Sequence, residues 1–177
     1  MDLTRMTPAD SSADEVDRRS LLKFGAAGLG LALTGRMTGT EAGGHLSGQQ
    51  RRTQQVAARL LRTIPTGDLA AMWSQFATGG FIEFPFSGVR ISDFATFEAD
   101  IGPLFAQLPD LTFTEPSFTP MADPNTVIAT FTGHATVTFT GKPYDQTYLS
   151  LVRVHRDKVQ SYTEYFDTAV LNEAFTP

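Results

Sequence analysis

The sequence predicts an α+β domain, a cone-shaped α+β barrel in which N-terminal helices close a strongly curved antiparallel sheet around an apolar pocket. The first observation is that residues 56–108 carry mostly helical spacings of apolar side chains. The second is that long stretches rich in Thr, Val, Phe and Tyr follow from residue 111, separated by turn signals. Helices first and long strands afterwards favour α+β over alternating α/β, and long twisted strands curl.

Residues 1–42 differ from the rest of the chain. Arg18 and Arg19 precede two leucines and a lysine, and a soft Gly- and Ala-rich apolar run of about 10 residues follows. This order resembles a twin-arginine export signal, with a small-x-small cleavage site ending at Ala42. The run is about half of a bilayer span, so no stable membrane anchor is expected. The predicted parts are an export signal and linker, 1–42, and one domain, 43–177, with a periplasmic or extracellular location.

Three helices are predicted before the long strands. Val56, Leu60 and Ile64 repeat every four residues, and Pro65 ends this first helix. The second begins at Thr66, buries apolar positions from 69 to 76, and ends at residues 79–80, which are both glycine. The third opens at residues 92–93 and runs to 108, with a kink or break at residues 102–103, Gly-Pro.

One short strand is expected at 81–86, between the second and third helices. The later strands are placed at 111–119, 126–139, 145–155 and 158–166, with a terminal helix at 168–175. In the 126–139 strand the odd positions are apolar, so they must face the interior. The even positions are mostly Thr, and they could face either solvent or a second subunit.

Two carboxylates alternate with aromatic residues on the strands. Glu164 lies between Tyr162 and Phe166 on one face of its strand, and Glu83 shares a face with Phe81. Alternation alone leaves the direction of Glu164 open, and hydrophobicity alone would leave Glu83 outside. If Glu164 faces an apolar cavity, desolvation raises its pKa and suits it to general acid or base chemistry.

Several segments together resemble the SnoaL-like branch of the nuclear-transport-factor-2-like superfamily, which includes polyketide cyclases, ketosteroid isomerases and phenazine-biosynthesis A/B proteins. They are residues 81–86, 108–110, 140–144 and 162–167. The resemblance covers roughly residues 50–175. It implies the cone fold, an apolar pocket without a metal, and commonly a homodimer. It also implies that Glu164 and Glu83 both point into the pocket as a catalytic pair. The pocket-lining residues expected with them are Phe81, Trp73, Phe131, Gly133, Ala135, Tyr162 and Phe166.

Other chemistries have little support in the sequence. The chain has no cysteine, and its three histidines are scattered, so neither a metal nor another cofactor is expected. The net charge is −5 without a long basic run, which argues against nucleic-acid binding. Epoxide hydrolases of the family carry an Arg and an Asp where this chain has Phe131 and Gly133, which argues against that reaction.

Three functions remain open on this basis, because a fold shared by many activities does not choose among them. The first is an isomerase, cyclase or dehydratase that moves a proton on a small apolar molecule. The second is a binding module that holds such a molecule without turnover. The third is a dimeric scaffold whose own phenylalanines fill the cone. A cavity well below about 300 Å³ would favour the scaffold.

Overall fold

The computed structural model describes residues 45–177, so the expected export signal with Arg18 and Arg19 lies outside the described residues. The elements follow one another as α2 (Gly48–Thr63), α3 (Leu69–Trp73), β1 (Phe76–Phe84), β2 (Val89–Ile91), α4 (Phe94–Ala106), β3 (Thr112–Phe113), β4 (Ser117–Pro120), β5 (Thr126–Thr136), β6 (Pro143–His155), β7 (Lys158–Phe166) and α5 (Thr168–Phe175). Short 3₁₀ turns follow α2 and β1.

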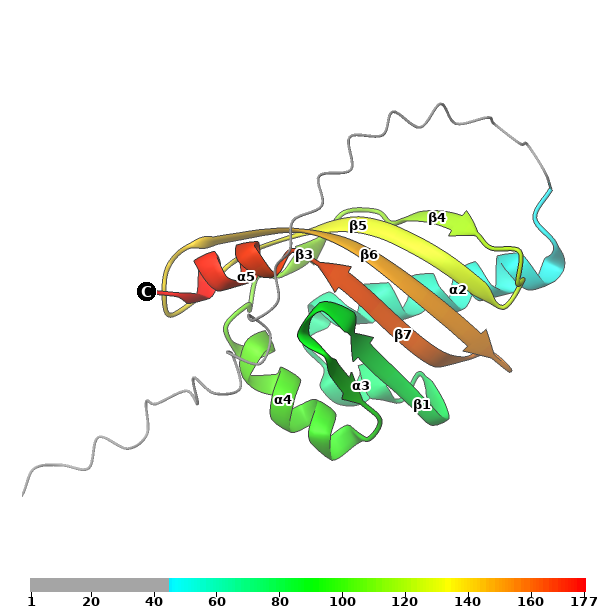
Figure 1. The fold of residues 1–177 in the computed structure, drawn as a ribbon, viewed down its shortest axis with the longest axis horizontal. Helices are drawn as coiled ribbons and strands as arrows, with labels where there is room; N and C mark the ends of the chain where they lie inside the picture. The colour runs from blue at the N-terminus through cyan, green and yellow to red at the C-terminus, as the bar shows by residue number, and fades with distance from the viewer. Residues whose placement is uncertain (1–44) are drawn as a thin grey trace, which may run out of the picture.

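The sheet has the strand order β2-β1-β7-β6-β5-β3, and β4 adds to the free part of β5. All pairs are antiparallel except β1 with β7, which is parallel. The strands β5 and β6 bend along their length, and the two edges of the sheet do not meet (Figure 1). The α+β class and the curved sheet of the cone are confirmed, with an open sheet in place of a closed barrel.

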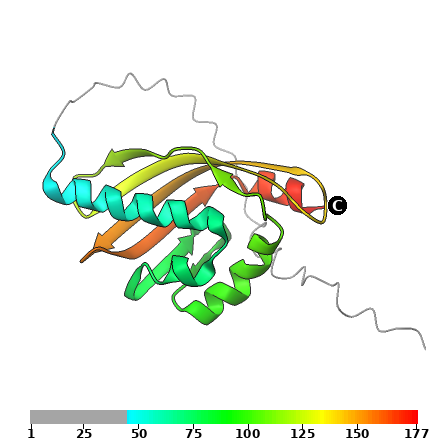
Figure 2. The ribbon, with the colours of Figure 1, turned by 180° about the vertical axis from the view of Figure 1, so that it is seen from behind.

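Helices cover the concave side of the sheet. Helix α2 lies across the strands, and α3 and α4 close the space beside β1 (Figure 2). Ser47 starts α2 with a capping box, in which its hydroxyl accepts from the backbone of Gln50 and the Gln50 side chain accepts in return. The stripe predicted from periodicity is the buried one, since Val56 and Leu60 are 3% and 1% exposed.

The second predicted helix is shorter than expected. It is capped by Asp68 instead of Thr66 and ends at Trp73, because Phe76 already pairs with β7. Gly79 and Gly80 do not end a helix. They form an irregularity inside β1, where Gly79 has φ +72° and a Cβ on Gly80 would lie 3.0 Å from a backbone oxygen of β7.

Other boundaries also differ from the predictions. Strand β1 occupies Phe76–Phe84 instead of 81–86, β6 begins at Pro143 instead of 145, and β2 was not predicted. Strand 111–119 is split into β3 and β4 around Pro116, which has no N–H to donate. Strand 126–139 ends at Thr136, because the amides of Val137 and Thr138 donate to Lys142 and Gln107 instead. Helix α4 passes through Pro103 as one element and ends at Ala106. The strand at 158–166 and the helix at 168–175 have the predicted bounds.

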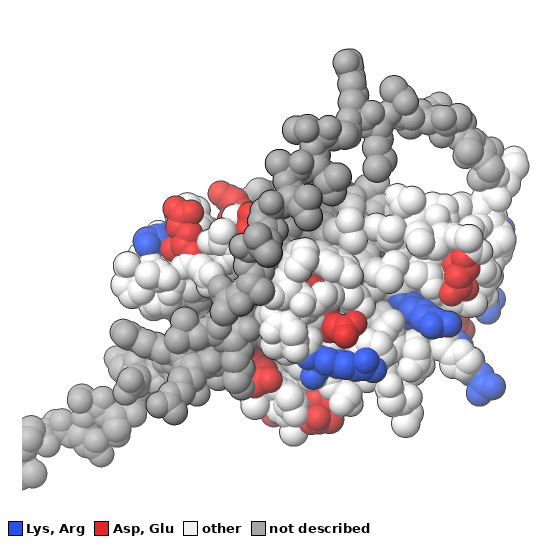
Figure 3. All heavy atoms as spheres, viewed as in Figure 1, with Lys and Arg blue, Asp and Glu red and all other residues white. Residues whose placement is uncertain are grey.

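Charged side chains of both signs are interspersed over the described residues on the face shown in Figure 3, without an extended basic area. Exposed apolar side chains are few within residues 45–177; the large ones are Phe86, Phe139 and Leu149, at 53%, 45% and 41% exposure. No helix in this part of the chain is long and apolar enough to cross a membrane.

Candidate functional site

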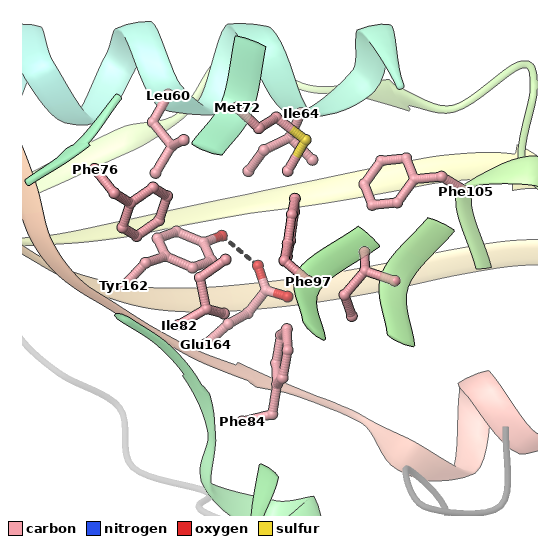
Figure 4. A pocket seen from close by; sticks show the side chains of 11 residues that line it. Leu60, Ile64, Met72, Phe76, Ile82, Phe84, Phe97, Phe105, Tyr162 and Glu164 are labelled. Atoms are coloured by element: carbon pink, nitrogen blue, oxygen red, sulfur yellow. Dashed lines mark hydrogen bonds between the residues drawn. The ribbon is translucent and has the colours of Figure 1, made fainter. Parts of the chain in front are cut away.

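A small apolar cavity of about 50 Å³ lies between the helices and the sheet (Figure 4). One charged side chain, Glu164, takes part in a wall that is otherwise made of apolar and aromatic side chains, with Tyr162 beside it. The lining comes from α2, α3, β1, α4 and β7 and consists of Leu60, Ile64, Met72, Phe76, Ile82, Phe84, Phe97, Ile101, Phe105, Tyr162 and Glu164.

The inward direction of Glu164 follows from its place in the sheet. Glu164 pairs in register with Ser150 of β6, and every even position of β6 from 144 to 154 is buried. Side chains that face each other across paired strands lie on the same side of the sheet. The side chains of Tyr162 and Glu164 therefore point to the concave side, on the strand face that the sequence analysis assigned to them.

Glu164 is the end of a chain of hydrogen bonds. The hydroxyl of Tyr162 donates to Oε2 of Glu164, and the hydroxyl of Ser150 donates to the Tyr162 oxygen at 2.9 Å. Figure 4 shows the second carboxyl oxygen on the side away from Tyr162. Ser150 is completely buried and Tyr162 is 4% exposed.

Desolvation dominates the electrostatics of Glu164, whose side chain is partly buried. Desolvation raises the pKa of Glu164 from 4.5 to about 7, and the nearby hydroxyls of Tyr162 and Ser150 lower that pKa only in part. Desolvation also raises the pKa of Tyr162 well above its ordinary value, with a further contribution from the nearby negative charge of Glu164. Tyr162 therefore stays protonated, and Glu164 is divided between its acid and its carboxylate near neutral pH.

A second polar pair lies further along the inner face of β6. The hydroxyls of Tyr144 and Tyr148 are 2.8 Å apart and buried. Desolvation raises the pKa of Tyr144 to about 12 and that of Tyr148 well above its ordinary value. Between them, the buried amide of Gln146 binds the backbone of Asp167 and so ties β6 to the start of α5. These phenols are therefore neutral hydrogen-bonding groups of the core.

The expectation that Glu83 points into the pocket is not what the structure shows. Ile82 and Phe84 line the cavity, and Glu83 alternates with them onto the opposite face of β1. There Glu83 is in register with Arg90 of β2, and the Arg90 guanidinium lies 3.5 Å from the ring centre of Phe81. Phe81 and Glu83 are thus corrected to the outer face, and Glu83 and Glu164 are not brought together.

The expected lining on β5 is filled by aromatic rings. Phe131 stacks on Tyr148 with ring centres 4.9 Å apart, and Phe113 of β3 lies 4.8 Å from Phe131. A Cβ on Gly133 would come within 3.0 Å of the rings of Tyr148 and Phe113, so this position has no open space. Ala135 packs against the same core. None of these three β5 residues lines the cavity.

Two further predicted residues support the lining from behind. Phe166 lies on the same face of β7 as Tyr162. Its ring packs edge-on against the ring of Phe84, with the ring centres 6.0 Å apart. Trp73 is stacked on Phe76 at 5.1 Å and tilted against Phe97 at 5.3 Å. Most of the actual wall was not predicted to line the pocket, although Leu60 belongs to the predicted apolar repeat of the first helix, and Met72 and Phe97 lie within the second and third predicted helices. Ser150 was not predicted either, and no sequence signal exists for it.

Two properties limit what this arrangement can do. A carboxyl with a pKa near neutral in an apolar wall can both give and accept a proton. The space of about 50 Å³ beside it is far below the several hundred Å³ of usual ligand sites, so an occupant larger than a water molecule or two must displace part of the wall. Within residues 45–177, no three acidic or histidine side chains gather as metal ligands would.

Comparison with known proteins identifies the family of this domain. Residues 57–162 match the family model of the SnoaL-like domain. The uncharacterised protein YesE of Bacillus subtilis is 33% identical over 108 residues, which cover 59% of this chain and 71% of YesE.

Solved structures show the same fold. A Bacillus subtilis protein provisionally described as an isomerase superposes with a TM-score of 0.66 at 27% identity, over 73% of this chain and 96% of its own. A Jannaschia protein provisionally described as a SnoaL-like polyketide cyclase gives 0.64 at 16% identity, over 76% and 99%, which shows the fold alone. A family match over more than half of the residues, together with the cone fold, means that this chain belongs to the SnoaL-like domain family of the nuclear-transport-factor-2-like superfamily.

Proposed function

We propose that this protein moves a proton on a small, largely apolar molecule that binds beside Glu164, as an isomerase, cyclase or dehydratase would. One observation carries the proposal, which is the carboxyl of Glu164 in a wall otherwise without charge. Burying a carboxyl costs free energy unless it is compensated, so a side chain that only filled space would be expected to be apolar. The description of the 27% identical structural relative, an isomerase, fits the same kind of chemistry.

The proposed mechanism uses this chain's own residues. The carboxylate form of Glu164 accepts a proton from an activated C–H or O–H of the bound molecule, and the resulting acid returns a proton to another atom of that molecule. The apolar side chains that line the cavity reduce the contact of Glu164 with water, which raises the carboxyl pKa toward neutral pH. General acid–base catalysis of this kind contributes about 10²–10⁴-fold to a rate.

The test begins with native mass spectrometry of the protein purified from the exported fraction of its own host. We expect a co-purified neutral small molecule. In D₂O, the wild-type protein should catalyse exchange of at least one carbon-bound hydrogen of this molecule. The Glu164→Gln variant should bind the molecule but exchange that hydrogen at least about 100-fold more slowly. Glu83→Gln is the matched control, because it removes the same charge from the outer face of β1 and should exchange at the wild-type rate.

Each reverse result contradicts part of this proposal. Full exchange by Glu164→Gln, or loss of exchange in Glu83→Gln alone, would show that Glu164 is not the acid and base. Absence of the protein from the exported fraction would contradict export, which we propose from residues 1–42 by their resemblance to a twin-arginine signal.

The second candidate function is a scaffold without a ligand. Two observations favour it, namely the cavity of about 50 Å³ and the rings that fill the cone around Phe131. A scaffold would purify from its own host without a bound small molecule. A co-purified small molecule would argue against it.

We propose in addition that the outer face of the sheet binds a second copy of this chain. Leu149 is 41% exposed and lies at the middle of the sheet, in register with Thr130 on β5 and Tyr165 on β7. Phe86 extends this apolar strip by an edge contact to Tyr165 at 5.5 Å. A strip of this kind is suited to an isologous contact, in which each copy covers the other.

Light scattering after gel filtration tests the dimer. The wild-type protein should have twice the chain mass, and Leu149→Glu should have the mass of one chain, because two carboxylates would be buried without partners. Ala169→Glu adds the same charge at an exposed position of α5 and should leave the dimer intact. A monomeric wild type, or a Leu149→Glu dimer, would show that this face is not the interface.

A further inference from the structure

When Glu164 is ionised, the hydroxyl chain behind it runs in one direction, because a carboxylate has no proton to donate. Ser150 gives its proton to the oxygen of Tyr162, and Tyr162 gives its proton to Oε2 of Glu164. Each hydroxyl has a single proton, so each of these donations uses the donor's only hydrogen. In the carboxylate form, Oε2 of Glu164 therefore has Tyr162 as its donor, whereas the other oxygen, Oε1, lies on the side away from Tyr162 (Figure 4).

The chain ends inside the core. Ser150 is 0% exposed, and among the side-chain hydrogen bonds of residues 45–177 none continues the chain beyond its hydroxyl. The nearby phenols of Tyr144 and Tyr148 form a pair of their own. A proton therefore has no hydroxyl path from Ser150 to solvent, and the chain is suited to holding Glu164 in place rather than to supplying protons.

We propose that Ser150 and Tyr162 are positioning residues that keep Oε2 of Glu164 occupied and leave Oε1 as the oxygen that exchanges a proton with a molecule in the cavity. The second half of this statement rests on the proposed function, whereas the occupation of Oε2 does not. The ligand chemistry that fits is a neutral molecule that offers one acidic C–H or one hydroxyl to a single oxygen and is apolar elsewhere. An anionic ligand would meet the carboxylate form of Glu164 in an apolar wall.

Few groups besides these hydroxyls influence the pKa of Glu164 among the described residues, so the effect of the hydrogen bonds on that pKa can be measured. Tyr162 faces it from β7, and Tyr144 and Tyr148 interact with it electrostatically from β6. The cavity lining contributed by α2, α3, β1 and α4 is apolar. The hydrogen bond from Tyr162 is the largest influence that lowers the pKa of Glu164, followed by a smaller contribution of the Ser150 hydroxyl.

Titration of Glu164 by ¹³C NMR, with the glutamate side chains labelled at the carboxyl carbon, tests the proposal without any ligand. Glu164→Gln assigns the signal. Tyr162→Phe should move its titration midpoint upward by about one pH unit, because the carboxylate loses its donor. Ser150→Ala should move it upward by less. Tyr144→Phe is the control, since it removes a buried phenol oxygen that does not bond to Glu164, and it should leave the midpoint within a few tenths of the wild-type value.

An unchanged or lower midpoint in Tyr162→Phe would overturn the proposal. If Tyr162→Phe does not fold, the smaller change Ser150→Ala tests the proposal instead, and an unchanged or lower midpoint in that variant would overturn it. The two proposals fail separately. Upward shifts in the titration together with no hydrogen exchange by the wild-type protein would leave the positioning of Glu164 intact and remove the catalytic role.

Discussion

Replacing Glu164 by Gln is expected to remove a pH-dependent loss of stability that amounts to about 3 kcal/mol in the wild-type protein. The pKa of Glu164 is raised in the folded chain from 4.5 to about 7, and each pKa unit corresponds to about 1.36 kcal/mol. Between these two values the folded state holds a proton that the unfolded state has released. Stability therefore falls as pH rises from about 4.5 to about 7, and the lower value persists above that range.

Urea unfolding at several pH values from 4.5 to 8.5 measures this effect. The wild-type free energy of unfolding should decrease across the range, and that of Glu164→Gln should decrease by about 3 kcal/mol less. The amide oxygen still accepts from Tyr162, so the comparison isolates the charge. Glu83→Gln should keep the wild-type pH dependence, because Glu83 lies on the outer face of β1. A Glu164→Gln variant with the wild-type slope would mean that Glu164 is ionised at neutral pH and is not a poised acid.

Replacing Phe97 by Ala should cost about 3–5 kcal/mol of stability and create a cavity that binds a benzene-sized molecule. Phe97 is 1% exposed, lines the cavity from α4 and packs against Trp73. Only Phe97 and Ile101 are buried in the whole of α4, so this ring is the principal attachment of the helix to the core. Its loss would join the space of the ring to the existing volume of about 50 Å³.

Thermal unfolding with and without benzene measures both parts of this prediction. Benzene should raise the melting temperature of Phe97→Ala and leave that of the wild type unchanged. Val152→Ala is the control, because Val152 is fully buried on β6 but does not line the cavity. It should lose stability without a response to benzene. A cost below about 1 kcal/mol for Phe97→Ala would mean that α4 does not seal the cavity, and that a ligand could enter there without displacing a packed ring.

The helices and strands could be predicted from the sequence where a strong apolar periodicity is bounded by a capping or turn residue. The apolar stripe of α2 and the Asp93 cap of α4 are of this kind, as are the bounds of β7 and α5. The boundary between α3 and β1 could not be predicted in this way. Residues 69–76 have helical spacing, but Phe76 pairs with β7, a partner more than 80 residues away. A long-range pairing of this sort outweighs local propensity and has no local signature.

The site was predicted only in part, because a strand offers two faces and alternation does not choose between them. Hydrophobicity alone indicated that Ile82 and Phe84 are inside and Glu83 outside, which is what the structure shows. The family resemblance indicated the reverse for Glu83. For Glu164 the resemblance and the structure agree on the inward direction, although its role in catalysis stays a proposal.

The sequence by itself determined the α+β class, the helical stripes and the alternation that places Tyr162 and Glu164 on one face, because periodicity and turn residues are local properties. Only the tertiary structure decided which face of β1 is buried, that Ser150 stands opposite Glu164, and that Phe113 fills the space beside Gly133. These features depend on the register between β6 and β7 and on the packing of β3 against β5. Contacts between distant segments of the chain set the volume of the cavity and the pKa of its one carboxyl.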